Sequence, residues 1–196
     1  MTHQTIKQTI KTQTGLTLFD TQLATATALQ QGKIAELPTG EGKTLAAVVA
    51  AICYAKEGRK VHILVFNDYL AKRDWSQNRS IYEASGVTVG FADQHSTAGE
   101  RKAAYACDVT YISAKQAGFD YLRDFLATSP SELVFPAFDV AIVDEADSIM
   151  IDECTTPLVL AGEIPTSEDV SQNINECIKT CQQTAMKLLK QRAKHG

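Results

Sequence analysis

The stretch that decides the fold is Thr39-Gly40-Glu41-Gly42-Lys43-Thr44. Glycines let a backbone turn closely around phosphate oxygens, and consecutive N–H groups can then point inward together with the positive end of a following helix. In such a loop Lys43 would reach the β- and γ-phosphates of a nucleotide, and the Thr44 hydroxyl would bind Mg²⁺. The stretch therefore predicts a nucleotide-binding loop, with the backbone of residues 39–42 supplying the remaining phosphate contacts.

The loop departs from the common phosphate-binding pattern at one position. That pattern has another glycine five residues before Gly42, where this chain has Leu37. The difference favours the shortened loop of helicase-type enzymes over a general P-loop enzyme. A tight turn at the start of a helix, with no ligand, is the simpler alternative for the same residues.

Strands and helices alternate on both sides of the loop. Short apolar runs predict strands at residues 34–37, 61–66, 87–91, 109–112 and 139–143. Helices are expected at residues 43–57, 69–85, 97–105 and 114–126, with Gly118 interrupting the last, and two prolines make residues 128–138 a loop. This order predicts an α/β fold with a doubly wound, mostly parallel sheet and helices on both faces.

A second candidate motif is Asp144-Glu145-Ala146-Asp147, directly after the apolar strand expected at residues 139–143. A parallel strand delivers such acids to the carboxyl edge of the sheet, where open α/β folds bind ligands. There Asp144 would hold Mg²⁺ through water, and Glu145 would orient and deprotonate the attacking water. An acidic loop after a strand is common by itself, but its combination with the glycine-rich loop is specific.

Composition excludes several other classes of protein. The net charge of −4, from 19 basic and 23 acidic residues, lacks the basic excess of most nucleic-acid binders. Five scattered cysteines match neither a disulfide framework nor a zinc pattern. No apolar run approaches the roughly 20 residues of a membrane span, and no signal peptide is recognisable. These features predict a cytoplasmic protein with reduced thiols and no nucleic-acid partner.

The two ends of the chain differ from its centre. Residues 1–17 are polar and rich in threonine. Residues 165–196 predict a long amphipathic helix with apolar positions at Val170, Ile174, Ile178, Cys181, Ala185 and Leu188. We therefore expect three parts, which are the polar segment at residues 1–17, the ATP-binding lobe at residues 18–164 and the long helix at residues 165–196.

Five segments, taken in order, resemble the SecA family of protein-translocating ATPases. They are residues 18–22, residues 34–36, residues 67–74 (Asn-Asp-Tyr-Leu-Ala-Lys-Arg-Asp), residues 118–124 (Gly-Phe-Asp-Tyr-Leu-Arg-Asp), and the acidic motif with the residues that follow it to Leu158. The third and fourth of these segments discriminate better than the glycine-rich loop. By this resemblance, residues 18–22 form the segment that recognises adenine, with Phe19 and Gln22 in the nucleotide site and Gln22 on the base.

The resemblance implies the first nucleotide-binding lobe, a RecA-like DEAD motor domain. Its cofactors would be ATP and Mg²⁺, and its catalytic residues would be Glu145 and Lys43. The family moves preproteins through a SecYEG-type channel from the cytoplasm, and its members can sit at the inner face of the cell membrane. It also implies a crosslinking domain and a second lobe with arginine fingers, neither of which lies in this sequence. We therefore expect residues 165–196 to begin the arm toward the crosslinking domain, and this chain alone to hydrolyse ATP slowly.

The sequence also departs from the family pattern. Pro38 and Thr155 stand where the family usually has arginine, and residues 113–117 replace a Thr-Asn-Asn/Ser-Glu-Phe run. These differences bear on contacts with other domains and with polypeptide more than on ATP binding.

Two other functions remain as alternatives. The literal Asp-Glu-Ala-Asp also suits the first lobe of a DEAD-box RNA helicase, but the Ser-Ala-Thr segment of such helicases does not occur between Asp147 and Gly196. Their Pro-Thr-Arg-Glu-Leu segment is also absent, because Asn-Asp-Tyr-Leu stands at residues 67–70. The second alternative is a module that holds nucleotide without hydrolysing it, against which the intact Lys43 and Glu145 argue.

Overall fold

The computed structural model describes residues 3–135 and 138–159 of the 196-residue chain. All of these residues belong to one compact unit, Met1–Leu160. The long helix expected at residues 165–196 lies outside the described residues. Within the described residues, no helix combines the length and the apolar character needed to cross a membrane.

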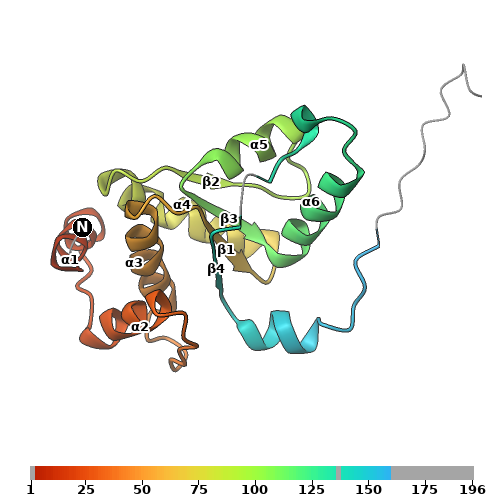
Figure 1. The fold of residues 1–196 in the computed structure, drawn as a ribbon. Coiled ribbons are helices and arrows are strands. Elements are labelled where there is room, and N and C mark those ends of the chain that lie inside the picture. Colours follow the sequence, from red (N-terminus) through yellow and green to blue (C-terminus); the bar gives the residue numbers. More distant parts are fainter. Residues whose placement is uncertain (1–2, 136–137, 160–196) are drawn as a thin grey trace, which may run out of the picture. The chain divides into compact units, whose positions relative to one another are not determined.

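A four-stranded parallel sheet forms the centre of this unit (Figure 1). Its strands are β1 (Val61–Val65), β2 (Val89–Phe91), β3 (Val109–Ser113) and β4 (Val140–Val143), in the spatial order β2-β3-β1-β4. Val61 of β1 lies opposite Val109 on one side and opposite Val140 on the other. All three strand pairings are parallel, which confirms the predicted α/β fold.

Four helices lie where the sequence predicted them. They are α3 (Lys43–Lys56), α4 (Asp68–Ala84), α5 (Ala98–Ala106) and α6 (Ala114–Leu126). Side-chain caps fix the start of the last three, because oxygen atoms of Asn67, Thr97 and Ser113 each accept a hydrogen bond from a backbone N–H in the first turn.

The prediction that Gly118 interrupts α6 was wrong. The helix continues through this residue. One glycine costs a helix only about 1 kcal/mol relative to alanine, which is too little to break a helix that is capped at its start. The side chain of Leu158 also lies close to this position, and a Cβ there would overlap it.

The polar segment at residues 1–17 contains a helix that its composition did not indicate. The helix α1 (His3–Thr14) buries Ile6 and Ile10 completely and packs against α4. It is followed by α2 (Asp20–Gln30), which packs against α3. Residues four apart share one helix face, so two isoleucines attach an otherwise polar helix to the core.

The strand expected at residues 34–37 does not form, and that prediction was wrong. No hydrogen bond joins the backbone of this segment to any other described residue, and Ile34 is 97% exposed. The segment lies between Gly32, which has a left-handed backbone, and Pro38, which has no N–H to donate. The burial gained by so short a run does not offset the entropy of ordering it as a strand.

The densest part of the core lies along α3. Its residues 48–52 are fully buried, because α3 packs against α2 and against the strands β1, β3 and β4. Each buried valine or isoleucine side chain stabilises the fold by about 1.5–3 kcal/mol. The core therefore fixes the body of α3, whose first residue is Lys43.

Candidate functional site

The glycine-rich loop has the backbone that its sequence predicts. Gly40 and Gly42 have φ angles of 90° and 78°, values that favour glycine, and Gly42 is the N-cap of α3. Lys43 is exposed, and no ion pair joins it to another residue of the described part of the chain. The loop therefore combines a left-handed glycine backbone, a helix N-terminus and an exposed cation, which are the parts of a phosphate site.

Gln22 is held against this loop. Its side chain is only 4% exposed, its Oε1 accepts a hydrogen bond from the Phe19 N–H at 3.1 Å, and its Nε2 donates to the Glu41 carbonyl at 2.9 Å. A Cβ on Gly42 would overlap the Gln22 amide, so glycine is required there for the close approach. One Nε2 hydrogen and one Oε1 lone pair remain for a further partner. Phe19 itself is 66% exposed.

The acidic motif leaves the sheet at the carboxyl end of β4. The Asp144 N–H donates to the Leu64 carbonyl of β1 at 2.9 Å, which extends the strand pairing by one bond. The Glu145 N–H then donates to Asp144 Oδ1 at 3.0 Å. Glu145 has a φ of 52°, the single positive φ among the non-glycine residues that the structure describes. Such backbone strain in a non-glycine residue occurs preferentially at functional sites.

Arg73 and Asp74 lie in the first half of α4, which starts beyond the carboxyl end of β1. Asp74 is only 3% exposed, and Arg73 Nη2 lies 2.7 Å from its Oδ1. The hydrogen bond to Asp74 raises the pKa of the Arg73 guanidinium, and the negative charge of Asp144 acts in the same direction. Asp74 therefore anchors the pair in the core, while the Arg73 side chain remains partly exposed.

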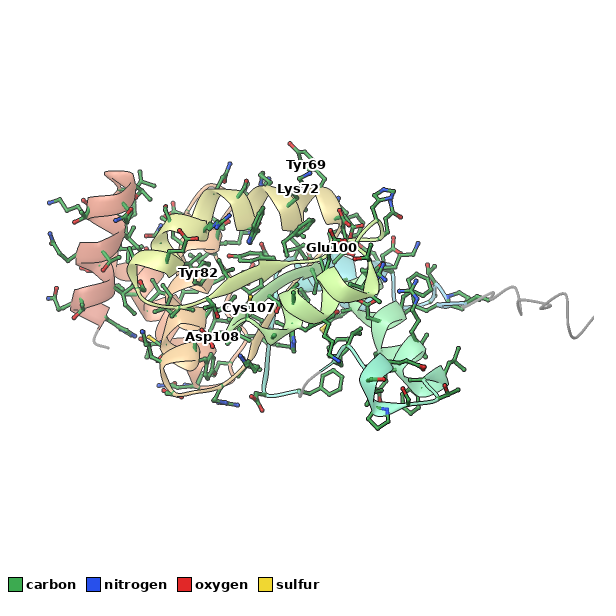
Figure 2. The ribbon with its side chains drawn as sticks, turned by 90° about the horizontal axis from the view of Figure 1, so that it is seen from above. Tyr69, Lys72, Tyr82, Glu100, Cys107 and Asp108 are labelled. Atoms are coloured by element: carbon green, nitrogen blue, oxygen red, sulfur yellow. The ribbon has the colours of Figure 1, made fainter. Side chains whose placement is uncertain are left out.

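The two sides of α4 carry different residues (Figure 2). Tyr69 projects away from the sheet and is 74% exposed, whereas Tyr82 is fully buried. The Tyr82 hydroxyl lies 3.0 Å from the Tyr111 hydroxyl of β3, and burial raises the pKa of both phenols. A buried polar contact of this kind fixes the helix on the sheet. If the helix moved, an unpaired buried hydroxyl would lower the stability of the fold by about 1–3 kcal/mol.

Asp120 of α6 is the centre of a second buried network, which sequence inspection missed. Its carboxylate is 1% exposed and accepts hydrogen bonds from the Tyr105 hydroxyl at 3.0 Å, Gln116 Nε2 at 2.8 Å and Arg123 Nη1 at 2.8 Å. Arg101 Nε of α5 lies 3.4 Å from the same group. The aspartate in the middle of a helix, followed three residues later by arginine, was the available signal. A cavity of about 240 Å³ adjoins this network, and no predicted site residue lines it.

The predicted site residues fall into two groups in the structure. The first group consists of Gln22 and the loop, which are hydrogen-bonded to each other. The second consists of Asp144 and Glu145 at the end of β4. No hydrogen bond or ion pair joins Lys43 or Thr44 to either acid in the described residues. A cation with its nucleotide phosphates is the kind of ligand that bridges such groups, since Mg²⁺ usually takes one or two carboxylates and completes its shell with water and phosphate.

Comparison with known proteins gives a consistent result. The family model described as "SecA DEAD-like domain" matches residues 2–195. Protein translocase subunit SecA 2 of Thermobifida fusca is 54% identical over 150 residues, and protein translocase subunit SecA 3 of Mycolicibacterium vanbaalenii is 51% identical over 156 residues. These alignments cover 76% and 80% of the chain but 20% of each relative. The chain therefore spans about a fifth of the length of these curated relatives.

A solved structure supports the fold independently. The crystal structure of a hypothetical ATP-dependent RNA helicase from Sulfolobus tokodaii superimposes with a TM-score of 0.56, over 78% of this chain and 44% of that one. The two sequences are 20% identical, so the likeness concerns the fold alone.

Proposed function

Because the chain belongs to the SecA DEAD-like domain family, we propose that it is the ATP-binding motor lobe of a SecA-type translocase, which couples ATP hydrolysis to the movement of preproteins across a membrane. The observation that carries the proposal is the loop of residues 39–44, where two left-handed glycines precede the exposed Lys43 at the start of α3. A helix N-terminus with free N–H groups and a lysine is the arrangement that holds nucleotide phosphates.

Each predicted residue has a distinct role in this proposal. Lys43 and the backbone of residues 39–42 bind the phosphates, and the Thr44 hydroxyl and Asp144 hold Mg²⁺. Glu145 orients and deprotonates the attacking water. Gln22 contributes its remaining hydrogen-bonding capacity to the adenine edge, and the exposed Phe19 ring lies beside the base. Bound Mg²⁺ would supply positive charge to the phosphate oxygens.

The larger assembly belongs to the proposal as well. A motor lobe at residues 18–164 and an arm at residues 165–196 would join a crosslinking domain and a second lobe. The partners would be a preprotein and a SecYEG-type channel, and the protein would work in the cytoplasm or at the inner face of the membrane. The RNA-helicase alternative has no comparable support, because the helicase-like structure shares only the fold with this chain.

Calorimetric titration with Mg·ADP tests the proposal. Lys43→Ala should weaken binding by about 2–3 kcal/mol, because it removes a charge-assisted hydrogen bond to phosphate. Lys33→Ala is the matched control, since Lys33 is also an exposed lysine, lies close in sequence and stands outside the loop. Equal affinities of the original chain and the Lys43 variant would overturn the assignment of the loop.

A further inference from the structure

We propose that Gly118 of α6 is a seat for the Leu158 side chain, and that this contact positions Asp144 and Glu145 for the bound nucleotide. The inference rests on the proposed function, because it gives two residues outside the nucleotide site a role in that same site. Gly118 and Leu158 are therefore positioning residues, which act through the backbone that joins them to the acidic motif.

The seat exists because Gly118 has no side chain. A Cβ built at this position would overlap Leu158 Cδ1. Leu158 is 38% exposed, whereas the next residue, Val159, is 69% exposed. Leu158 thus packs on the helix backbone at Gly118. This contact requires a glycine there, although glycine is unfavourable in the interior of a helix. Figure 1 shows this part of the chain running beside α6.

The segment from Asp144 to Leu158 is attached at both of its ends. At the first end, the Asp144 N–H donates to the Leu64 carbonyl at 2.9 Å. Between the ends lies a π-helical turn (Ser148–Asp152), and the backbone hydrogen bonds around it stay within the segment. Residues 150–157 are all exposed. The first part of the segment is half-buried at Ala146, Ser148 and Ile149, and the contact at Gly118 joins its far, exposed end to the body of the lobe.

Attachment at both ends matters because Glu145 is strained. Its φ of 52° is unfavourable for a residue with a side chain, and such a conformation persists only where the surrounding structure over-determines it. A segment fixed at two ends has fewer alternative conformations than a segment fixed at one. Release of Leu158 would therefore widen the range of conformations open to Glu145 and to the Asp144 side chain, while the Asp144 N–H stays bonded to the Leu64 carbonyl.

Gly118→Ala separates this local role from global stability. The group that the new methyl would displace is the far end of a flexible leucine side chain, which can rotate aside at little cost. The helix itself gains from alanine, because glycine is the poorer helix former. We therefore expect the variant to keep its thermal midpoint or exceed it, while losing the seat.

The experiment measures ADP affinity by calorimetry in Mg²⁺ and in EDTA for Gly118→Ala, Leu158→Ala and the double variant. The gain in affinity due to Mg²⁺ should fall roughly three- to ten-fold in each single variant, because the competent arrangement of Asp144 becomes only partly populated. Affinity in EDTA should not change, since the loop makes those contacts alone. The double variant should be no worse than either single one, because both substitutions remove one and the same contact.

Hydrogen exchange supplies a second measurement that does not depend on nucleotide. Amides of residues 145–153 should exchange faster in all three variants. Val159→Ala and Gly99→Ala are the controls, because Val159 is exposed beside Leu158 and a Cβ at Gly99 would meet open space. Neither control should change exchange in this segment or the Mg²⁺-dependent gain.

Three results would decide against parts of the argument. Unchanged amide exchange of residues 145–153 in Gly118→Ala would show that the contact between Gly118 and Leu158 does not hold this segment. Additive effects of the two substitutions would show the same. Faster exchange with an unchanged Mg²⁺-dependent gain would overturn its positioning role. Absence of nucleotide binding by the original chain would overturn the proposed function, while the exchange data would still judge the seat separately.

Discussion

Glu145 combines the chemical role proposed for it with a backbone conformation that disfavours side chains. Its φ of 52° lies in the left-handed region, which costs a residue with a Cβ about 1–2 kcal/mol. We predict that Glu145→Gly is more stable to urea unfolding than Glu145→Ala by about 1 kcal/mol, although both variants lose the carboxylate. Equilibrium unfolding of the two proteins measures this difference directly.

Asp147 provides the matched control for that prediction. It is exposed and lies two residues further along, but its backbone is right-handed, with φ at −61° and ψ at −50°. There the order should reverse, with Asp147→Ala more stable than Asp147→Gly by about 0.5–1 kcal/mol. If Glu145→Ala proves at least as stable as Glu145→Gly, as expected for the alanine variant at Asp147, the backbone of Glu145 is not strained.

Gln22 shows what sequence inspection can and cannot supply at the scale of one residue. From the sequence alone, Gln22 is compatible both with a solvent-exposed position on a helix and with the base contact that the family resemblance implies. The structure excludes the first, because Gln22 is 4% exposed and bonded to the glycine-rich loop. Nothing in the local sequence indicates that bond, since it joins residues 19 positions apart whose proximity depends on how α2 packs against α3.

At the scale of the element, β1 carries a buried histidine. His62 is 4% exposed and lies among aromatic rings, with the ring centroid of Tyr105 at 5.6 Å and that of Phe135 at 5.4 Å. Burial lowers the pKa of His62, and the negative charge of Asp139 opposes this shift only in part. The folded protein therefore keeps this imidazole neutral at pH values where the unfolded chain takes up a proton.

This difference makes stability depend on pH. The contribution of neutral His62 is fully present above the ordinary histidine pKa of about 6.5 and is lost as pH falls below it, by at most about 1.4 kcal/mol per pH unit. We predict that His62→Phe removes this part of the dependence, whereas substitution of the exposed His95 by glutamine keeps it. Urea unfolding between pH 5 and pH 7.5 provides the comparison, and parallel curves for His62→Phe and the original chain would contradict it.

Elements with their own apolar pattern were predictable, and elements that depend on partners were not. The buried strand β1 and the helix α3 are recognisable in the sequence as continuous apolar runs, so their ends were predicted within one or two residues. The helix α1 is polar and is held by two isoleucines against α4, so its own sequence gives little indication of it. Residues 34–37 show the opposite case, because this short apolar run forms no strand and pairs with no other segment among the residues that the structure describes.

At the scale of the whole molecule, we predict that the proposed site suffices for nucleotide binding but not for fast hydrolysis. Negative charge accumulates on the γ-phosphate in the transition state, and an arginine supplied by a facing lobe accelerates other nucleotide hydrolases by about 10³–10⁵. The two arginines within the family-like segments are already engaged, Arg73 with Asp74 and Arg123 with Asp120. We predict that this chain alone binds ATP and hydrolyses it near the background rate.

Phosphate release by the purified chain, with and without the second lobe of a SecA relative, tests this prediction. Addition of the second lobe should raise turnover by orders of magnitude, and Glu145→Gln should abolish the increase while nucleotide binding persists. Equal turnover by the chain alone and by the reconstituted pair would show that the chemistry needs no facing lobe.

The strand order also has a consequence for synthesis on the ribosome. β1 lies between β3 and β4, so one of its edges stays unpaired until β4 has emerged, roughly 80 residues later in the chain. At about 5–20 residues per second, a nascent chain leaves the N–H and C=O groups of that edge unpaired for several seconds. An edge of this kind is a template for pairing with a neighbouring nascent chain. The lobe should therefore depend on chaperones most during the interval before its acidic motif has been translated.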